Sequence, residues 1–133
     1  METINSTTKF DAVRSIPFSS LFMAYWGGVE NRFGIITADG DIICPNILTR
    51  IDEPFNTLLP IGTDAKTGCI DLYTNQLVSP EFDDVELDDD GPIVFIKEGQ
   101  RGYVTDKGEF VTVDQFDSDD KYIDVPIIST RLP

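Results

Sequence analysis

Carboxylates are the residues of this chain whose number and clustering best suit them to chemistry. The 133 residues include 24 Asp and Glu, against 10 Lys and Arg, and no histidine. Two carboxylates that flank a glycosidic bond can hydrolyse it when their surroundings push their pKa values apart. With 24 acids, some pair falls at a suitable distance by chance, so we interpret them as solvated surface groups. We therefore expect no enzyme activity, and a carboxylate enzyme ranks third among the alternatives.

Other catalytic and metal-binding chemistries lack their usual residues. The absence of histidine removes the commonest general base, the Ser-His and Cys-His nucleophile pairs and the commonest metal ligand. Cys44 and Cys69 cannot form a four-ligand zinc site by themselves, and we predict that both are buried thiols without a disulfide. No glycine-rich phosphate loop is present. The sequence therefore predicts no cofactor.

Two acidic runs contain the oxygen ligands that calcium prefers, Asp88-Asp89-Asp90-Gly91 and Asp117-Ser118-Asp119-Asp120. Neither run has the spacing of an EF-hand loop, and neither has a Glu at its twelfth position. We interpret both as solvated acidic loops, with weak adventitious calcium binding as the alternative.

The acids are concentrated in one part of the chain. Residues 81–124 hold 15 carboxylates and four cations, whereas residues 1–80 hold nine and five. Such a chain is repelled by nucleic acid and by anionic membranes, so its expected partner is basic. Clustered like charges repel one another and gain nothing for folding, which favours a surface that steers a basic partner; plain acidic surface is the alternative.

We predict that this acidic face binds the partner. Tyr25, Trp26 and Tyr122 are candidate aromatic anchors, with burial in the core as the alternative for each. The predicted partner-binding residues are Asp83, Asp84, Glu86, Asp88, Asp89, Asp90, Asp114, Asp117, Asp119, Asp120 and Tyr122.

A repeat must position these side chains. Gly34, Gly68 and Gly102 are separated by 34 residues twice over, and each begins a short apolar phrase that ends in turn residues. A fixed period of this length indicates a repeat architecture. In the third copy, residues 92–98, 102–105 and 109–113 have the composition of strands, with turns at 99–100 and 106–108. We expect each glycine to permit a close approach that a Cβ would block.

The period makes further residues equivalent. Ile35, Cys69 and Tyr103 follow the three glycines and should occupy equivalent places. Residues 82–85 are echoed at 10–13 and 116–119, and residues 92–94 at 126–128. If adjacent units stack in register, Asp83 lies over Asp117 and Glu86 lies over Asp120.

These observations predict one all-β domain of meander or hairpin repeats, stacked like a small solenoid, barrel or propeller. The domain covers residues 10–133 and follows a flexible tail, residues 1–9. A leading partial copy near 10–26 precedes the three glycine copies, and a trailing strand near 122–130 follows them. The two ends either cap a stack or close a ring.

The pattern over residues 10–128 resembles the WG (KWG) repeat of bacterial proteins, in which a Trp-Gly pair, a strand, an Asp-x-x-Gly-like turn and a later Pro/Tyr-Asp phrase recur. Here the aromatic residue before glycine is Phe33 in the first copy, and Thr67 and Arg101 replace it in the others. The resemblance implies an all-β repeat domain that serves as a binding scaffold.

The residues at the start of the chain lack the basic and apolar segments of a secretion signal, so we expect a cytoplasmic location. The leading hypothesis is a small acidic protein, taken as a monomer, that neutralises a basic protein. Its most concrete form is an immunity protein or inhibitor of a bacterial toxin or nuclease, and a nucleic-acid mimic is a close relative of that idea. The alternative is an adaptor or structural module of a bacterial assembly.

Overall fold

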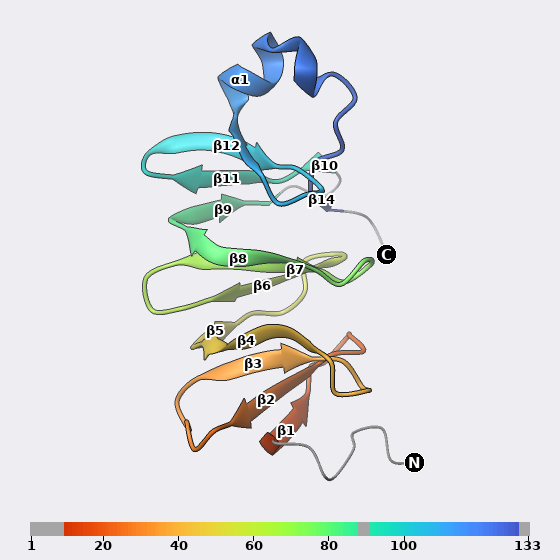
Figure 1. Cartoon of the computed structure of the whole chain (residues 1–133), viewed down its shortest axis with the longest axis vertical. Coiled ribbons are helices and arrows are strands. Elements are labelled where there is room, and N and C mark those ends of the chain that lie inside the picture. Colours follow the sequence, from red (N-terminus) through yellow and green to blue (C-terminus); the bar gives the residue numbers. More distant parts are fainter. Residues whose placement is uncertain (1–9, 88–90, 131–133) are drawn as a thin grey trace.

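The chain folds into three antiparallel sheets of four strands each, which follow one another along the long axis of the molecule (Figure 1). A computed structural model describes residues 10–87 and 91–130. The first sheet runs in the order β1 (Phe10–Ser15), β2 (Phe22–Trp26), β3 (Phe33–Ile36) and β4 (Ile42–Leu48). The second runs β5 (Arg50–Ile51), β6 (Leu58–Gly62), β7 (Thr67–Asp71) and β8 (Gln76–Phe82). The third runs β9 (Asp84–Glu86), β11 (Val94–Lys97), β12 (Gln100–Val104) and β13 (Phe110–Thr112). The all-β prediction is confirmed.

Four short elements complete the fold beside the third sheet. Helix α1 (Val113–Ser118) and the 3₁₀ helix η1 (Asp120–Tyr122) follow β13. Strand β10 (Gly91–Pro92) pairs with β14 (Ser129–Thr130) in a small separate sheet. Among the described strands, β14 pairs with β10 and β1 pairs with β2, so no pairing between the two ends closes the three sheets into a ring.

The repeated glycines occupy the third strand of each sheet. Gly34 lies in β3, Gly68 in β7 and Gly102 in β12. A Cβ at any of the three would collide with a backbone carbonyl oxygen of the strand that follows, and none of the three needs a left-handed backbone. The pairing register shifts beside Gly34 and Gly68, where the next strand bulges toward the glycine. The expected close approach is therefore confirmed.

A second 34-residue series stabilises the turn after each glycine strand. Thr37, Asp71 and Thr105 each accept a hydrogen bond, through a side-chain oxygen, from a backbone N–H two or four residues further on. The distances are 3.1, 2.9 and 3.1 Å. Asp71 and Thr105 are buried, and these turn hydrogen bonds satisfy them there.

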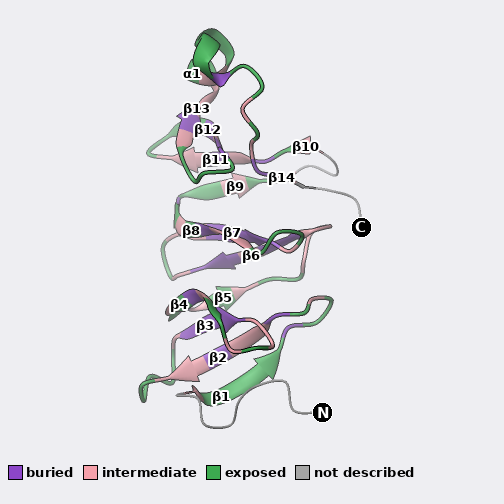
Figure 2. Cartoon of the chain, turned by 45° about the vertical axis from the view of Figure 1, so that its right-hand side comes forward, coloured by how far each residue is buried: buried purple, intermediate pink, exposed green. Residues whose placement is uncertain are grey.

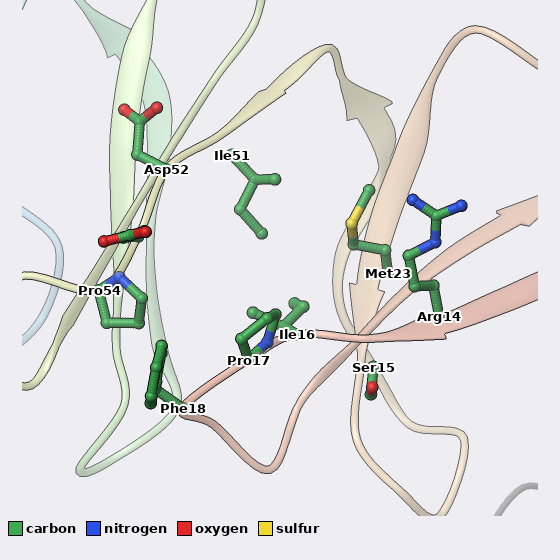
Figure 3. Close-up of a pocket in the computed structure, with 10 residues that line it drawn as sticks. Arg14, Ser15, Ile16, Pro17, Phe18, Met23, Ile51, Asp52 and Pro54 are labelled. Carbon is green, nitrogen blue, oxygen red and sulfur yellow. The ribbon is translucent and has the colours of Figure 1, made fainter.

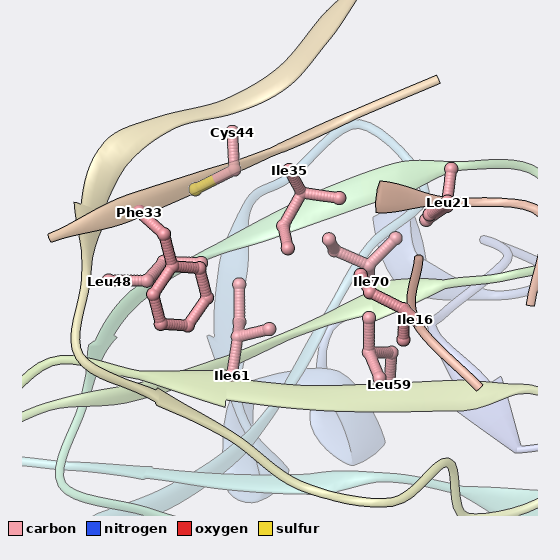
Figure 4. Packing of buried hydrophobic residues seen from close by; sticks show 9 residues of the cluster. All are labelled: Ile16, Leu21, Phe33, Ile35, Cys44, Leu48, Leu59, Ile61 and Ile70. Atoms are coloured by element: carbon pink, nitrogen blue, oxygen red, sulfur yellow. The ribbon is translucent and has the colours of Figure 1, made fainter. Parts of the chain in front are cut away.

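Hydrophobic cores fill the spaces between successive sheets, and Figure 4 draws the first of them. Figure 2 shows where the buried residues lie along the strands. The first core joins the first and second sheets through Ile16, Leu21, Phe33, Ile35, Cys44, Leu48, Leu59, Ile61 and Ile70. The second joins the second and third sheets through Leu58, Cys69, Val78, Phe82, Ile93, Phe95, Val104 and Ile128. Burial of this apolar surface is the main force that holds the sheets together.

The predicted equivalence of Ile35, Cys69 and Tyr103 is also confirmed. Ile35 faces the second sheet, Cys69 faces the third, and the Tyr103 ring contacts Phe116 of α1 edge-on at 5.1 Å. Each residue thus points toward the layer that follows its own. Helix α1 takes the place that a further sheet would have.

The prediction that residues 116–119 repeat residues 82–85 is wrong. Phe82 ends strand β8, whereas Phe116 lies inside α1. The helix begins because Thr112 and Gln115 form a capping box, in which each side chain bonds the backbone N–H of the other residue. Only the two residues of β14 remain of the predicted trailing strand, and the predicted flexible tail lies outside the described residues.

Candidate functional site

The predicted acidic residues fall into two separate groups. Asp83, Asp84 and Glu86 lie at or beside β9, one edge strand of the third sheet. The second group follows β13, the opposite edge strand, and consists of Asp114, Asp117, Asp119 and Asp120. Three strand spacings separate the two edges, which is roughly 14 Å. Residues 88–90 lie outside the described residues.

The expected stacking of Asp83 with Asp117 and of Glu86 with Asp120 is wrong. It required residues 117–120 to continue the repeat beside β8 and β9. Asp117 instead belongs to α1 and Asp120 to η1, beyond the opposite edge of the sheet. The fold therefore does not bring the two members of either pair together, and they do not repel each other at close range.

The first acidic group is largely paired with cations. The Asp83 carboxylate accepts hydrogen bonds from Lys66 Nζ at 2.5 Å and from the backbone N–H of Glu98 at 2.9 Å. The bond from Lys66 is the main cause that lowers the pKa of Asp83. Glu86 pairs with Arg101 at 2.7 Å. These carboxylates thus keep little uncompensated charge for a partner.

The same pattern of pairing extends to neighbouring sheets. Lys97 of β11 reaches Glu81 of β8 at 3.4 Å, and Arg32 reaches Asp64 at 3.6 Å. All these side chains are substantially exposed, so each pair contributes about 0–1 kcal/mol to stability. Their larger effect is on the charge of the surface, because they pair half of the Lys and Arg side chains that the structure describes.

The negative charge of the second acidic group is not neutralised by paired cations within the described residues. We call residues 113–124 the C-terminal acidic segment; it holds five carboxylates and one cation, Lys121. All five carboxylate residues are exposed, and none forms an ion pair within the described part of the chain. The amino group of Lys121 lies 4.9 Å from the centre of the Tyr122 ring. Contact with Tyr122, more than the nearby Asp119, raises the pKa of Lys121.

The candidate aromatic anchors pack against other residues of the protein. Tyr122 is buried and stacks on Phe116, with ring centres 6.0 Å apart, so its predicted exposure to a partner is wrong. Tyr25 and Trp26 are half-buried, and Trp26 lies over Gly34 while its ring contacts Phe10 edge-on at 5.3 Å. The burial alternative therefore describes these residues better than the anchor prediction.

The cysteines are buried free thiols, as predicted. Burial raises the pKa of Cys44 to about 11 and that of Cys69 to about 12, with a smaller contribution from Asp71 at Cys69. Both therefore remain protonated at neutral pH and are poor nucleophiles. Within residues 10–87 and 91–130, no three His, Cys, Asp or Glu side chains gather as metal ligands would.

An apolar hollow of about 430 Å³ lies between the turn that joins β1 to β2 and the segment after β5 (Figure 3). Phe18 stands at its margin, 86% exposed, with a left-handed backbone at φ 63°. The lining residues are Arg14, Ser15, Ile16, Pro17, Phe18, Met23, Ile51, Asp52, Glu53 and Pro54. Sequence reasoning missed this site, although the apolar run Ile16-Pro17-Phe18 at a turn was a visible signal.

No helix in the described ranges is long and apolar enough to cross a membrane. The chain matches no protein-family model, no curated protein and no solved structure. Its function must therefore be argued from its own surfaces.

Proposed function

We propose that this chain is a small acidic binding protein that neutralises a basic protein partner, and that the C-terminal acidic segment is its contact surface. The single observation that carries the proposal is the imbalance of that segment, which has five exposed carboxylates and one Lys. The first acidic group contributes less, because Lys66 and Arg101 already pair with Asp83 and Glu86.

The most concrete partner is a bacterial toxin or nuclease, for which the chain acts as an immunity protein or inhibitor. A nuclease must present positive charge to hold phosphate, so a negative surface is complementary to its substrate-binding face. A degenerate WG-like repeat supplies the scaffold in this proposal. Its sheets form an open, solenoid-like stack that displays the acidic segment at one end, and the site of action is the cytoplasm.

The test is the association rate of the captured partner. After affinity capture from the host, stopped-flow association is measured at low and at physiological salt for the wild type and a quadruple variant. The variant carries Asp114→Asn, Asp117→Asn, Asp120→Asn and Asp124→Asn. The wild-type rate should fall as salt rises, and the variant should associate at least tenfold more slowly at low salt, because long-range attraction steers the encounter.

A matched control separates local steering from net charge. It neutralises four exposed acids elsewhere, by Glu30→Gln, Asp39→Asn, Asp41→Asn and Asp106→Asn, and so carries the same net charge as the first variant. The control should associate nearly as fast as the wild type. A salt-independent wild-type rate, or equal rates for the two variants, would contradict the proposal and favour the adaptor alternative.

A further inference from the structure

We propose that the hollow between the first and second sheets binds a segment of a partner protein that presents an aliphatic or aromatic side chain beside a Lys or Arg. This surface is separate from the C-terminal acidic segment, so the two proposals succeed or fail independently. At about 430 Å³ the hollow falls within the size range of small ligand sites. It admits one large apolar side chain and its neighbours.

The floor of the hollow is apolar and belongs to the first core. Ile16 is buried in that core, and Met23 and Ile51 pack against it while also lining the hollow (Figure 3). Pro17 and Pro54 stand on its two walls, and the fixed φ of proline limits the movement of both. An apolar side chain that enters therefore meets a preformed surface and orders little of the protein.

Phe18 has a conformation and an exposure that packing within the protein does not account for. A bulky side chain is disfavoured at positive φ, yet Phe18 adopts φ 63° and leaves its ring 86% exposed. The surrounding turn maintains this conformation. Ser19 Oγ donates to the Ile16 carbonyl oxygen at 2.9 Å and accepts from the Leu21 N–H at 3.1 Å.

Such strain, kept at an exposed aromatic residue, is typical of binding sites. Aromatic residues, Phe among them, are also enriched at protein–protein interfaces. Phe18 therefore fits the role of a wall against which the entering side chain packs.

The charge at the margin of the hollow favours a partner segment with a Lys or Arg beside the apolar side chain. Asp52 and Glu53 are exposed there, and within the described residues neither forms an ion pair. Arg14 is the one cation in the lining, so the margin carries a net charge of −1. In Figure 3, Asp52 and Arg14 lie on opposite sides of Ile51 and Met23. A cation beside the apolar side chain can thus approach Asp52 without meeting Arg14.

The proposal is tested with three capped peptides, Gly-Lys-Leu-Lys-Gly, Gly-Glu-Leu-Glu-Gly and Gly-Lys-Ser-Lys-Gly, titrated into the ¹⁵N-labelled protein. With the first peptide, the backbone amide signals that shift should be those of residues 14–16, 18, 23 and 51–53, since Pro17 and Pro54 have no N–H. The Glu peptide should bind at least fivefold more weakly because its charge repels the margin, and the Ser peptide likewise because it lacks the apolar side chain.

Variants then assign the binding to named side chains. Phe18→Ala should weaken the Lys-Leu-Lys peptide at least fivefold, and so should Asp52→Asn combined with Glu53→Gln. Tyr73→Ala is the matched control, because Tyr73 is another exposed aromatic residue at a turn, 75% exposed. The control should bind like the wild type, and circular dichroism should show that every variant keeps its fold.

Three results would overturn the proposal. The first is equal binding of the Lys-Leu-Lys and Glu-Leu-Glu peptides, and the second is shifts confined to other residues. The third is sedimentation that shows self-association of the free protein, lost in Phe18→Ala, because a second copy would then be the occupant.

Discussion

At the scale of single residues, the repeat depends on what the backbone requires. Gly34, Gly68 and Gly102 were predictable because a Cβ at each would collide with a carbonyl oxygen of the next strand, so the residue type itself repeats. Thr37, Asp71 and Thr105 have a shared role as well, since each offers an oxygen to its turn. That role was missed, because Thr and Asp fulfil it with different side chains and no single residue type stands at all three positions.

A substitution at Gly68 tests the close approach. The Cβ of Gly68→Ala would collide with the Val78 carbonyl oxygen and the backbone beyond it, which cannot yield as a side chain can. The free energy of unfolding in urea should fall by about 2 kcal/mol. Gly91→Ala is the control, because a Cβ there meets nothing within 4 Å, and its unfolding should match the wild type. Equal stability of the two variants would mean that the repeated glycines are incidental.

At the scale of elements, the three meanders could be predicted and the helix could not. Strand composition and turn residues recur with the period, which located the strands of the third sheet to within a few residues. The period also made Phe116 look like Phe82, because the two residues are 34 apart. The two segments differ in the residues just before these phenylalanines. Thr112 and Gln115 occupy the positions that are 34 residues after Val78 and Glu81. Only the later pair can form a capping box, and that local signal overrides the repeat.

The acidic site was predictable in composition but not in geometry. The concentration of acids after residue 80 is plain in the sequence. Which acids are neutralised depends on the hairpins, since Lys66 and Asp83 are 17 residues apart and meet only when β7 and β8 are folded. The buried position of Tyr122 likewise depends on α1, which the period did not predict.

Removal of the N-terminal cap of α1 should destabilise that helix. In Thr112→Ala the N–H of Gln115 loses its acceptor, so the free energy of unfolding should fall by about 1 kcal/mol. Hydrogen exchange at residues 113–118 should accelerate, while amides of the first core keep their protection. Thr112→Ser keeps the hydroxyl and should behave like the wild type. Uniform acceleration throughout the chain would show instead that α1 and the sheets unfold as one unit.

At the scale of the whole molecule, stability depends on a balance between net charge and local ion pairs. Two like charges 15 Å apart in water repel by about 0.3 kcal/mol, and 14 excess charges form roughly 90 pairs. The described salt bridges contribute at most about 1 kcal/mol each. Repulsion is the larger effect, although the unfolded chain shares part of it.

Salt should therefore stabilise this protein. Raising sodium chloride from about 0.01 M to 0.5 M shortens the Debye length well below the size of the domain, so repulsion is screened. The Tm measured by differential scanning calorimetry should rise by several degrees. Because screening also weakens the ion pairs, a Tm that falls with salt would show that those pairs outweigh the net charge.

The separation of the two cores has a consequence for how such a chain changes in length. The middle sheet meets one neighbour through Leu59, Ile61 and Ile70, and the other through Leu58, Cys69 and Val78. Its two faces thus connect a preceding sheet to a following one. Duplication of a 34-residue segment inside the gene would add a layer about 10 Å thick and leave both terminal surfaces intact. Where the duplicated segment follows the hollow beside Phe18, evolution can therefore alter the distance between that hollow and α1 in fixed steps, independently of what either site binds.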